Sequence, residues 1–180
     1  TLFADLAQQA VASRGLFTVA LSGGTTPGAL FRLLAAEPYR GQLPWAGIHL
    51  FWADERCVPP DDPGSNYRLA YDTLIAHISL PPQNIHRIRG EKKPEDAARA
   101  YHQELSAFFG PPQPRFDLVL LGLGQDGHTA SLFPGTETLA EAELSAVPAT
   151  ANYDGRPSRR VTLTLPALNG ARNVVFLVSG

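Results

Sequence analysis

The chain has 180 residues, of which 44% are hydrophobic and 18% charged, and its formal net charge is −2. This composition predicts one globular domain with a proper core, and the small net charge excludes a general affinity for nucleic acid or anionic membranes. No segment approaches the ~18 unbroken apolar residues that a membrane-spanning helix needs. The lone Cys57 excludes an internal disulfide and suits a reducing compartment, so we expect a cytoplasmic protein.

Hydrophobic periodicity predicts helices and strands that alternate along the chain. In order we expect a helix at 2–11 ended by Gly15, a strand at 17–21, a helix with Pro27 in its first turn, a strand at 48–53, a helix at 66–78, a short strand at 85–88, a helix at 94–109, and strands at 118–121, 161–165 and 174–178. This alternation indicates an α/β fold with a mainly parallel sheet covered by helices on both faces.

The loop after the strand at 118–121 carries the strongest functional signal. It places Asp126 and His128 among several glycines, at the carboxyl end of a buried strand, where open α/β sheets bind ligands. Histidine acts as acid or base near neutral pH, and Asp126 is close enough in sequence to bias the imidazole tautomer. The alternative is a hydrogen-bonded loop histidine. We expect no zinc site, because the chain has no cysteine cluster and no HExxH helix.

The other four histidines lack polar neighbours in the sequence, so we expect each to be structural or exposed; they are His49, His77, His86 and His102.

A second glycine loop, Ser22-Gly23-Gly24-Thr25-Thr26, follows the strand at 17–21 and precedes a helix. The two glycines let backbone amides approach an anion, and the two threonine hydroxyls and the helix N-terminus add favourable contacts. The pattern predicts a phosphate-binding loop, although it is neither the P-loop nor the dinucleotide fingerprint. A tight turn with a threonine cap is the alternative.

Charged residues gather at two further places that can complete an anion site. Asp54 and Arg56 directly follow the strand at 48–53; Arg56 can hold a phosphate bidentately, while Asp54 can orient a histidine or a sugar hydroxyl. Asn66 is expected either to cap the helix at 66–78 or to contact the ligand. Arg160 precedes a strand and can join the anion site. A solvated turn or loop is the alternative for both charged segments.

Four segments together resemble the 6-phosphogluconolactonase family, a branch of the glucosamine-6-phosphate isomerase/6-phosphogluconolactonase family. They occur in the family's order and cover nearly the whole chain: LSGGTTPGALFRLLA at 21–35, FWADERCVPPDDPGSNYRLA at 51–70, LGLGQDGHTASLFPGT at 121–136 and RVTLTLPALNGARNVVFLVSG at 160–180. The resemblance implies a Rossmann-like three-layer α/β/α fold. It also implies hydrolysis of 6-phospho-D-glucono-1,5-lactone in the oxidative pentose phosphate pathway, without metal or organic cofactor.

The resemblance also assigns roles to individual residues. His128 matches the catalytic histidine, and Asp54 matches the acidic residue beside the substrate. Arg56, Arg160 and the loop at 23–26 match phosphate or substrate contacts. Which carboxylate lies nearer the imidazole stays open; we favour Asp54 for the chemistry and Asp126 for shaping the loop.

Two alternative functions use similar residues. Related sugar-phosphate deaminases carry a tyrosine after the Asp-Glu pair and a different segment after the histidine, so Arg56 and Thr129 favour the lactonase. A non-catalytic sugar-phosphate sensor usually adds a DNA-binding domain, which is not seen here. We expect 1–180 to be one domain without the family's N-terminal strand and C-terminal helix, a monomer or weak oligomer whose partner is a small-molecule substrate. The end at Gly180 resembles another strand-to-loop junction.

Overall fold

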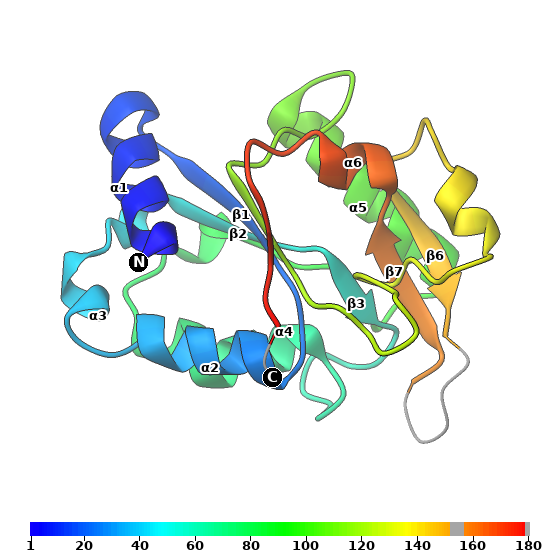
Figure 1. Cartoon of the computed structure of the whole chain (residues 1–180), viewed down its shortest axis with the longest axis horizontal. Coiled ribbons are helices and arrows are strands. Elements are labelled where there is room, and N and C mark those ends of the chain that lie inside the picture. Colours follow the sequence, from blue (N-terminus) through cyan, green and yellow to red (C-terminus); the bar gives the residue numbers. More distant parts are fainter. Residues whose placement is uncertain (152–156, 179–180) are drawn as a thin grey trace.

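A five-stranded parallel sheet forms the centre of the computed structural model, which describes residues 1–151 and 157–178 (Figure 1). The junction expected at Gly180 lies outside the described residues. The strand order is β4-β2-β1-β5-β8. The strands are β1 (Phe17–Leu21), β2 (Ile48–Trp52), β4 (Ile85–His86), β5 (Leu118–Leu121) and β8 (Val174–Phe176). The predicted α/β class and the mainly parallel sheet are therefore confirmed.

A second, antiparallel sheet of three strands lies beside the first, in the order β3-β7-β6. Its strands are β3 (Asp54–Arg56), β6 (Ala146–Thr150) and β7 (Arg159–Leu163). The sequence did not predict β6, because Pro148 interrupts it; proline is tolerated there since β6 is an edge strand. The solvated turn considered for residues 54–56 is wrong, because they form a strand paired with β7.

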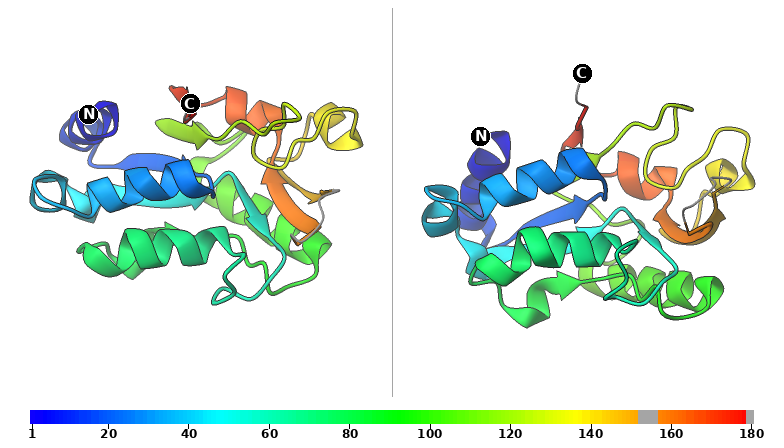
Figure 2. Two further views of the ribbon diagram at one scale, coloured as in Figure 1. Left: turned by 60° about the horizontal axis from the view of Figure 1, so that its bottom comes forward. Right: turned by 90° about the horizontal axis from the view of Figure 1, so that it is seen from below.

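Helices lie on both sides of the parallel sheet (Figure 2). They are α1 (Leu2–Arg14), α2 (Thr25–Leu34), α3 (Tyr39–Gln42), α4 (Asn66–Thr73), α5 (Pro94–Phe109) and α6 (Leu165–Asn169), with 3-10 turns η1 (Trp45–Gly47), η2 (Ile75–His77), η3 (Pro82–Asn84) and η4 (Glu137–Ala140). Gly15 ends α1 in the left-handed conformation, as predicted. The helix expected at 66–78 stops at Thr73, where the chain tightens into η2. No helix in the described ranges is long and apolar enough to cross a membrane.

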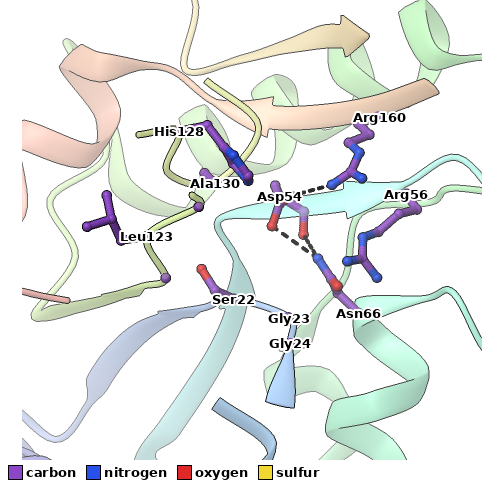
Figure 3. Close-up of a pocket in the computed structure, with 12 residues that line it drawn as sticks. Ser22, Gly23, Gly24, Asp54, Arg56, Asn66, Leu123, His128, Ala130 and Arg160 are labelled. Atoms are coloured by element: carbon purple, nitrogen blue, oxygen red, sulfur yellow. Dashed lines mark hydrogen bonds and ion pairs between the residues drawn. The ribbon is translucent and has the colours of Figure 1, made fainter. Parts of the chain in front are cut away.

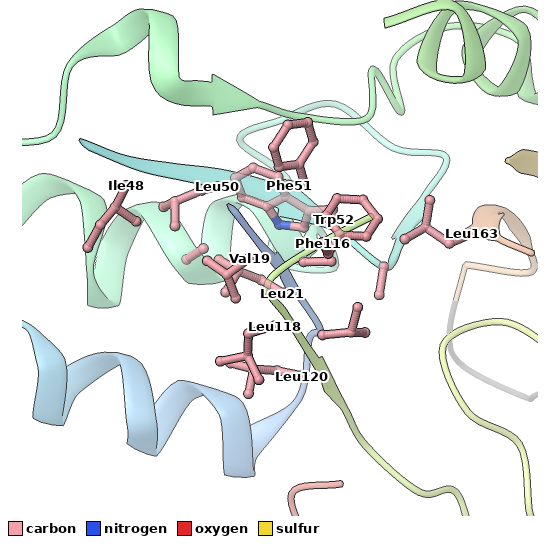
Figure 4. Packing of buried hydrophobic residues seen from close by; sticks show 14 of the residues in the cluster. Val19, Leu21, Ile48, Leu50, Phe51, Trp52, Phe116, Leu118, Leu120 and Leu163 are labelled. Atoms are coloured by element: carbon pink, nitrogen blue, oxygen red, sulfur yellow. The ribbon is translucent and has the colours of Figure 1, made fainter. Parts of the chain in front are cut away.

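Buried hydrophobic side chains of β1, β2 and β5 pack together in the core (Figure 4). Every residue of β1 is buried, and β2 buries Phe51 and Trp52 at its carboxyl end. The Tyr101 hydroxyl bonds both the N–H and the carbonyl of Trp52, which ties α5 to that end. Because Leu21 pairs with Trp52, the loops that leave β1 and β2 emerge together at one edge of the sheet.

All four histidines expected to lack polar neighbours have them. The His77 Nε2 lies 2.9 Å from the Asp72 carbonyl oxygen, and the His102 Nδ1 accepts the Ser145 N–H at 3.1 Å. The His49 and His86 side chains lie 3.1 Å apart, and the other ring nitrogen of His86 lies 2.9 Å from Glu104. The sequence did not reveal this because β2 and β4, which are 37 residues apart at these positions, become neighbours only in the sheet.

Candidate active site

A pocket with a volume of about 200 Å³ opens at this edge (Figure 3). His128 lies on one side of Asp54, and Arg56 and Arg160 lie on the other. The lining comes from the loops after β1 and β5, from β3 and β7, and from the start of α4: Ser22, Gly23, Gly24, Asp54, Arg56, Asn66, Gly122, Leu123, Gly124, His128, Ala130 and Arg160. The structure therefore brings together most of the predicted residues.

The first glycine loop supplies only part of what the sequence predicted. Gly23 and Gly24 line the pocket, whereas Thr25 and Thr26 begin α2 and are not among the lining residues. Gly24 has a φ of 108°, a backbone conformation that other residues rarely adopt. A Cβ on Gly23 would lie 1.7 Å from the Asn66 Oδ1, so only glycine fits against that side chain.

The loop after β5 holds His128 against its own backbone. The Gly124 N–H donates to the His128 carbonyl at 2.8 Å, and a Cβ on Gly124 would lie 2.1 Å from the imidazole Nδ1. The Thr129 hydroxyl donates to the Gly122 carbonyl at 2.9 Å. Ala130 has a φ of 49°, an uncommon conformation for a residue with a side chain, and such strain often accompanies function. Because Gly124 has no side chain, the His128 imidazole can pack directly against the loop backbone.

Asp126 is the carboxylate in contact with the imidazole. Its Oδ1 lies 2.5 Å from the His128 Nδ1 and also accepts the His128 backbone N–H at 3.3 Å. Which carboxylate lies nearer the imidazole was open from the sequence; Asp54 has its two carboxylate oxygens bonded to the Asn66 amide at 3.0 Å and the Ser131 hydroxyl at 2.7 Å. β3 turns Asp54 towards these buried partners on other segments, so Asp126 is the nearer carboxylate of the two. Asp126 both shapes the loop and orients the histidine.

The side chains of β3 alternate between two environments, as in any strand. Asp54 and Arg56 line the pocket, while Glu55 between them points to α4. Arg160 on β7 pairs with Arg56 in the antiparallel register and lies 3.8 Å from the Asp54 carboxylate. Arg160 is only 3% exposed, so the solvated loop considered for it is wrong.

Arg56 and Asn66 are fixed by different neighbours. The Arg56 guanidinium donates to the Gly64 carbonyl at 2.6 Å. Ser65, rather than Asn66, caps α4, since its hydroxyl accepts the Arg68 N–H. The Asn66 amide NH₂ donates to the Asp54 carbonyl and carboxylate, which places Asn66 in the pocket wall instead.

Five lining residues were not among the predicted site residues, namely Ser22, Gly122, Leu123, Gly124 and Ala130. Their signal was their position within the two glycine loops. Leu123 is the exception, because an apolar residue that is 58% exposed at a pocket mouth has no signature in sequence. Within residues 1–151 and 157–178, no three histidine, cysteine, aspartate or glutamate side chains gather in a way that could hold a metal ion.

The fold and the pocket agree with comparisons to known proteins. This chain is 47% identical over 176 residues to 6-phosphogluconolactonase from Synechocystis sp., which covers 96% of this chain and 70% of that protein. It is 41% identical to 6-phosphogluconolactonase from Haemophilus influenzae, over 90% of this chain and 68% of that protein. The structure resembles that of 6-phosphogluconolactonase from Thermotoga maritima with a TM-score of 0.86 and 31% identity, over 97% of this chain and 75% of that one.

These similarities confirm the family resemblance found in the four sequence segments. Residues 1–180 match the family described as glucosamine-6-phosphate isomerases/6-phosphogluconolactonase. The chain belongs to this glucosamine-6-phosphate isomerase/6-phosphogluconolactonase family.

Proposed function

We propose that this chain is a 6-phosphogluconolactonase, which hydrolyses 6-phospho-D-glucono-1,5-lactone to 6-phosphogluconate in the oxidative pentose phosphate pathway. The observation that carries the proposal is one pocket with a histidine–carboxylate pair at one end and two arginines at the other. Relatives that bear this enzyme's name at 41–47% identity support it. Such a pocket suits a substrate with a phosphate at one end and a reactive carbonyl at the other.

Arg56 and Arg160 form the proposed phosphate-binding end. They lie directly opposite each other on β3 and β7, an arrangement in which like charges repel unless an anion lies between them. Two guanidinium groups thus line this end of the pocket, and the Asp54 carboxylate lies 3.8 Å from that of Arg160. Gly24 adds a backbone open to close approach, and Gly23 lines the pocket next to it. A phosphate dianion fits this end best.

His128 and Asp126 form the proposed catalytic end. With the Nδ1–H donated to the Asp126 carboxylate, the Nε2 lone pair serves as the general base. It takes a proton from water as the water oxygen attacks the C1 carbonyl. The bond between C1 and the ring oxygen then breaks, and the imidazolium returns the proton to that oxygen. The product is an open-chain carboxylic acid, which releases its proton to the solvent and becomes a carboxylate, and Asp126 stabilises the transient imidazolium charge.

Asp54 has a proposed role between the two ends. Its carboxylate is buried and bonded to Asn66, which packs against the loop after β1, and to Ser131 in the loop after β5. Asp54 therefore fixes the positions of these two loops relative to each other. Because its charge would repel a phosphate, it favours binding with the phosphate towards the arginines and the sugar hydroxyls towards Asp54. Asp54 thereby sets the direction in which the substrate lies in the pocket.

The direct test is pH-stat hydrolysis of freshly made 6-phosphogluconolactone, corrected for spontaneous ring opening. We expect enzyme-dependent proton release that saturates with substrate. Release of ammonia from glucosamine 6-phosphate would instead identify a deaminase. Tight binding of 6-phosphogluconate without turnover of the lactone would identify a sensor.

The remaining proposals concern the domain organisation and the oligomeric state of the enzyme. We propose one catalytic domain that acts on a small-molecule substrate as a monomer or weak oligomer. The mass of the protein in solution, measured by light scattering, tests the second point.

A further inference from the structure

Glu55 is a buried carboxylate that the proposed mechanism does not use. It lies between Asp54 and Arg56 on β3, and its side chain points to the face opposite the pocket lining. Only 2% of the residue is exposed. A buried charge is costly unless hydrogen bonds compensate it, so its partners indicate why it is there.

Four donors converge on the two Glu55 oxygens. Oε1 accepts the backbone N–H groups of Arg56 and Asn66, both at 2.7 Å. Oε2 accepts the Tyr67 N–H at 2.7 Å and the Ser65 hydroxyl at 2.9 Å. Burial raises the pKa of Glu55, and these four hydrogen bonds oppose that rise. The carboxylate therefore clamps the first turn of α4 onto β3 and fixes the backbone of two residues that line the pocket.

The clamp extends to the first glycine loop through Asn66. The Asn66 amide NH₂ donates to two oxygens of Asp54, so its Oδ1 must point the other way. That oxygen lies where a Cβ of Gly23 would be, in contact with the loop backbone. Glu55 thus holds the Asn66 backbone, and the Asn66 side chain, which Figure 3 shows between Asp54 and Gly23, reaches from β3 to the loop after β1.

We infer that Glu55 is a positioning residue, which sets the spacing between the Arg56 guanidinium and the Gly23–Gly24 loop and so determines affinity for the phosphate group. The inference rests on the proposed function for the identity of the ligand. Glu55 itself touches neither the pocket nor the reacting atoms.

A carboxylate suits this place better than its neutral isostere. Glutamine at position 55 offers one acceptor oxygen and one NH₂ group. If the NH₂ replaces Oε2, the Tyr67 N–H has no acceptor; if it replaces Oε1, the N–H groups of Arg56 and Asn66 have none. Either orientation leaves at least one buried N–H unpaired, which moves the start of α4.

The sign of the effect separates positioning from simple electrostatics. Neutralising a carboxylate close to a phosphate site would tighten phosphate binding if charge alone acted. Loss of positioning weakens binding instead. The Glu55→Gln variant therefore distinguishes the two explanations by the direction of the change in affinity.

The experiment compares the full-length wild-type protein with Glu55→Gln, Glu55→Ala and a control, Asp117→Asn. Asp117 is also buried, and it accepts the Thr18 N–H and hydroxyl at 3.0 and 3.2 Å, but it lies at the opposite end of the parallel sheet. Calorimetry gives the Kd for 6-phosphogluconate and for inorganic phosphate, circular dichroism gives the melting temperature, and pH-stat assays give kcat and KM.

We expect about a tenfold rise in Kd and KM for Glu55→Gln, the size of one lost buried hydrogen bond, and a larger rise for Glu55→Ala. We expect kcat to fall less than KM rises, and Asp117→Asn to lower only the melting temperature. Unchanged or tighter binding in Glu55→Gln, or an equal loss in Asp117→Asn, overturns the inference. Absence of wild-type turnover alone contradicts the proposed function but leaves the binding comparison decisive; absence of wild-type binding overturns both.

Discussion

The two sheets contribute to the pocket in different ways. The parallel sheet provides loops at the ends of β1 and β5, where glycines bring backbone and His128 to the surface. The antiparallel sheet provides buried charged side chains from within the strands themselves, Asp54 and Arg56 on β3 and Arg160 on β7. Catalysis is thus expected on the loop after β5, and phosphate binding on the strand pair together with the loop after β1, so substitutions in these two regions are expected to change different kinetic parameters.

The largest expected effect comes from removing the imidazole of His128. We expect His128→Ala to lower kcat by at least about 10²-fold, the lower end for general acid–base catalysis, with a much smaller change in KM. Because His128 lies in a surface loop, the melting temperature is expected to change little. Steady-state assays on fresh lactone measure both parameters. A variant with near-normal kcat would remove His128 from the mechanism.

Removing an arginine tests the other sheet. We expect Arg56→Ala to raise KM by about 10- to 100-fold with a smaller change in kcat, because a charge-assisted bond to phosphate contributes roughly 1.5–3 kcal/mol. The matched control is Arg99→Ala, since Arg99 is an exposed arginine on α5 that pairs with Asp96 outside the pocket. An unchanged KM in Arg56→Ala would show that phosphate binds elsewhere.

Two glycine substitutions apply the same chemical change to the loop after β5 and to the loop after β1, which packs through Asn66 against Asp54 of β3. A Cβ on Gly124 would lie 2.1 Å from the His128 Nδ1 and 2.8 Å from the Asp126 Oδ1, so Gly124→Ala must displace the imidazole. A Cβ on Gly23 would collide with Asn66 instead. We expect Gly124→Ala mainly to lower kcat and Gly23→Ala mainly to raise KM, each with a stability loss of about 1–3 kcal/mol. The same kinetic change in both variants would contradict the division.

The difference between the sheets also explains what the sequence could predict. The strands β1 and β5 and the helix α5 matched the expected bounds, because their apolar runs and their turn or capping residues are local signals. Glycine and histidine in a loop at a strand end are local signals too. The loop that carries His128 and the first glycine loop could therefore be recognised in the amino-acid sequence alone.

The antiparallel sheet was not predictable in this way. A three-residue strand made of Asp54, Glu55 and Arg56 has no apolar pattern, and its burial depends on β7, which follows about a hundred residues later. The same distance hides the pairing of Arg56 with Arg160. The sequence left open whether Asp54 or Asp126 lies nearer the imidazole for the same reason, since the partners that hold Asp54 come from other segments.

The smallest expected effect lies in the parallel sheet, away from the pocket. Burial, and secondly the neighbouring His86, lower the pKa of His49 below its ordinary value of 6.5. The unfolded chain therefore binds a proton on His49 at a higher pH than the folded chain does, and stability rises with pH in the interval between the two pKa values. Above about pH 6.5, the contribution of neutral His49 to the free energy of unfolding is fully present. It is lost as the pH falls below 6.5.

Chemical denaturation from pH 7.5 to 5 measures this slope in the wild type and in His49→Phe. Phenylalanine keeps a ring against Phe108, which lies 5.1 Å from the His49 ring between centroids, but it has no proton to bind. We expect the free energy of unfolding of the variant to fall less steeply below pH 6.5, with KM and kcat at pH 7.5 unchanged. Identical slopes would assign the acid sensitivity to other groups. A change in KM would show that the two regions are not independent, because packing at the start of β2 would then reach β3.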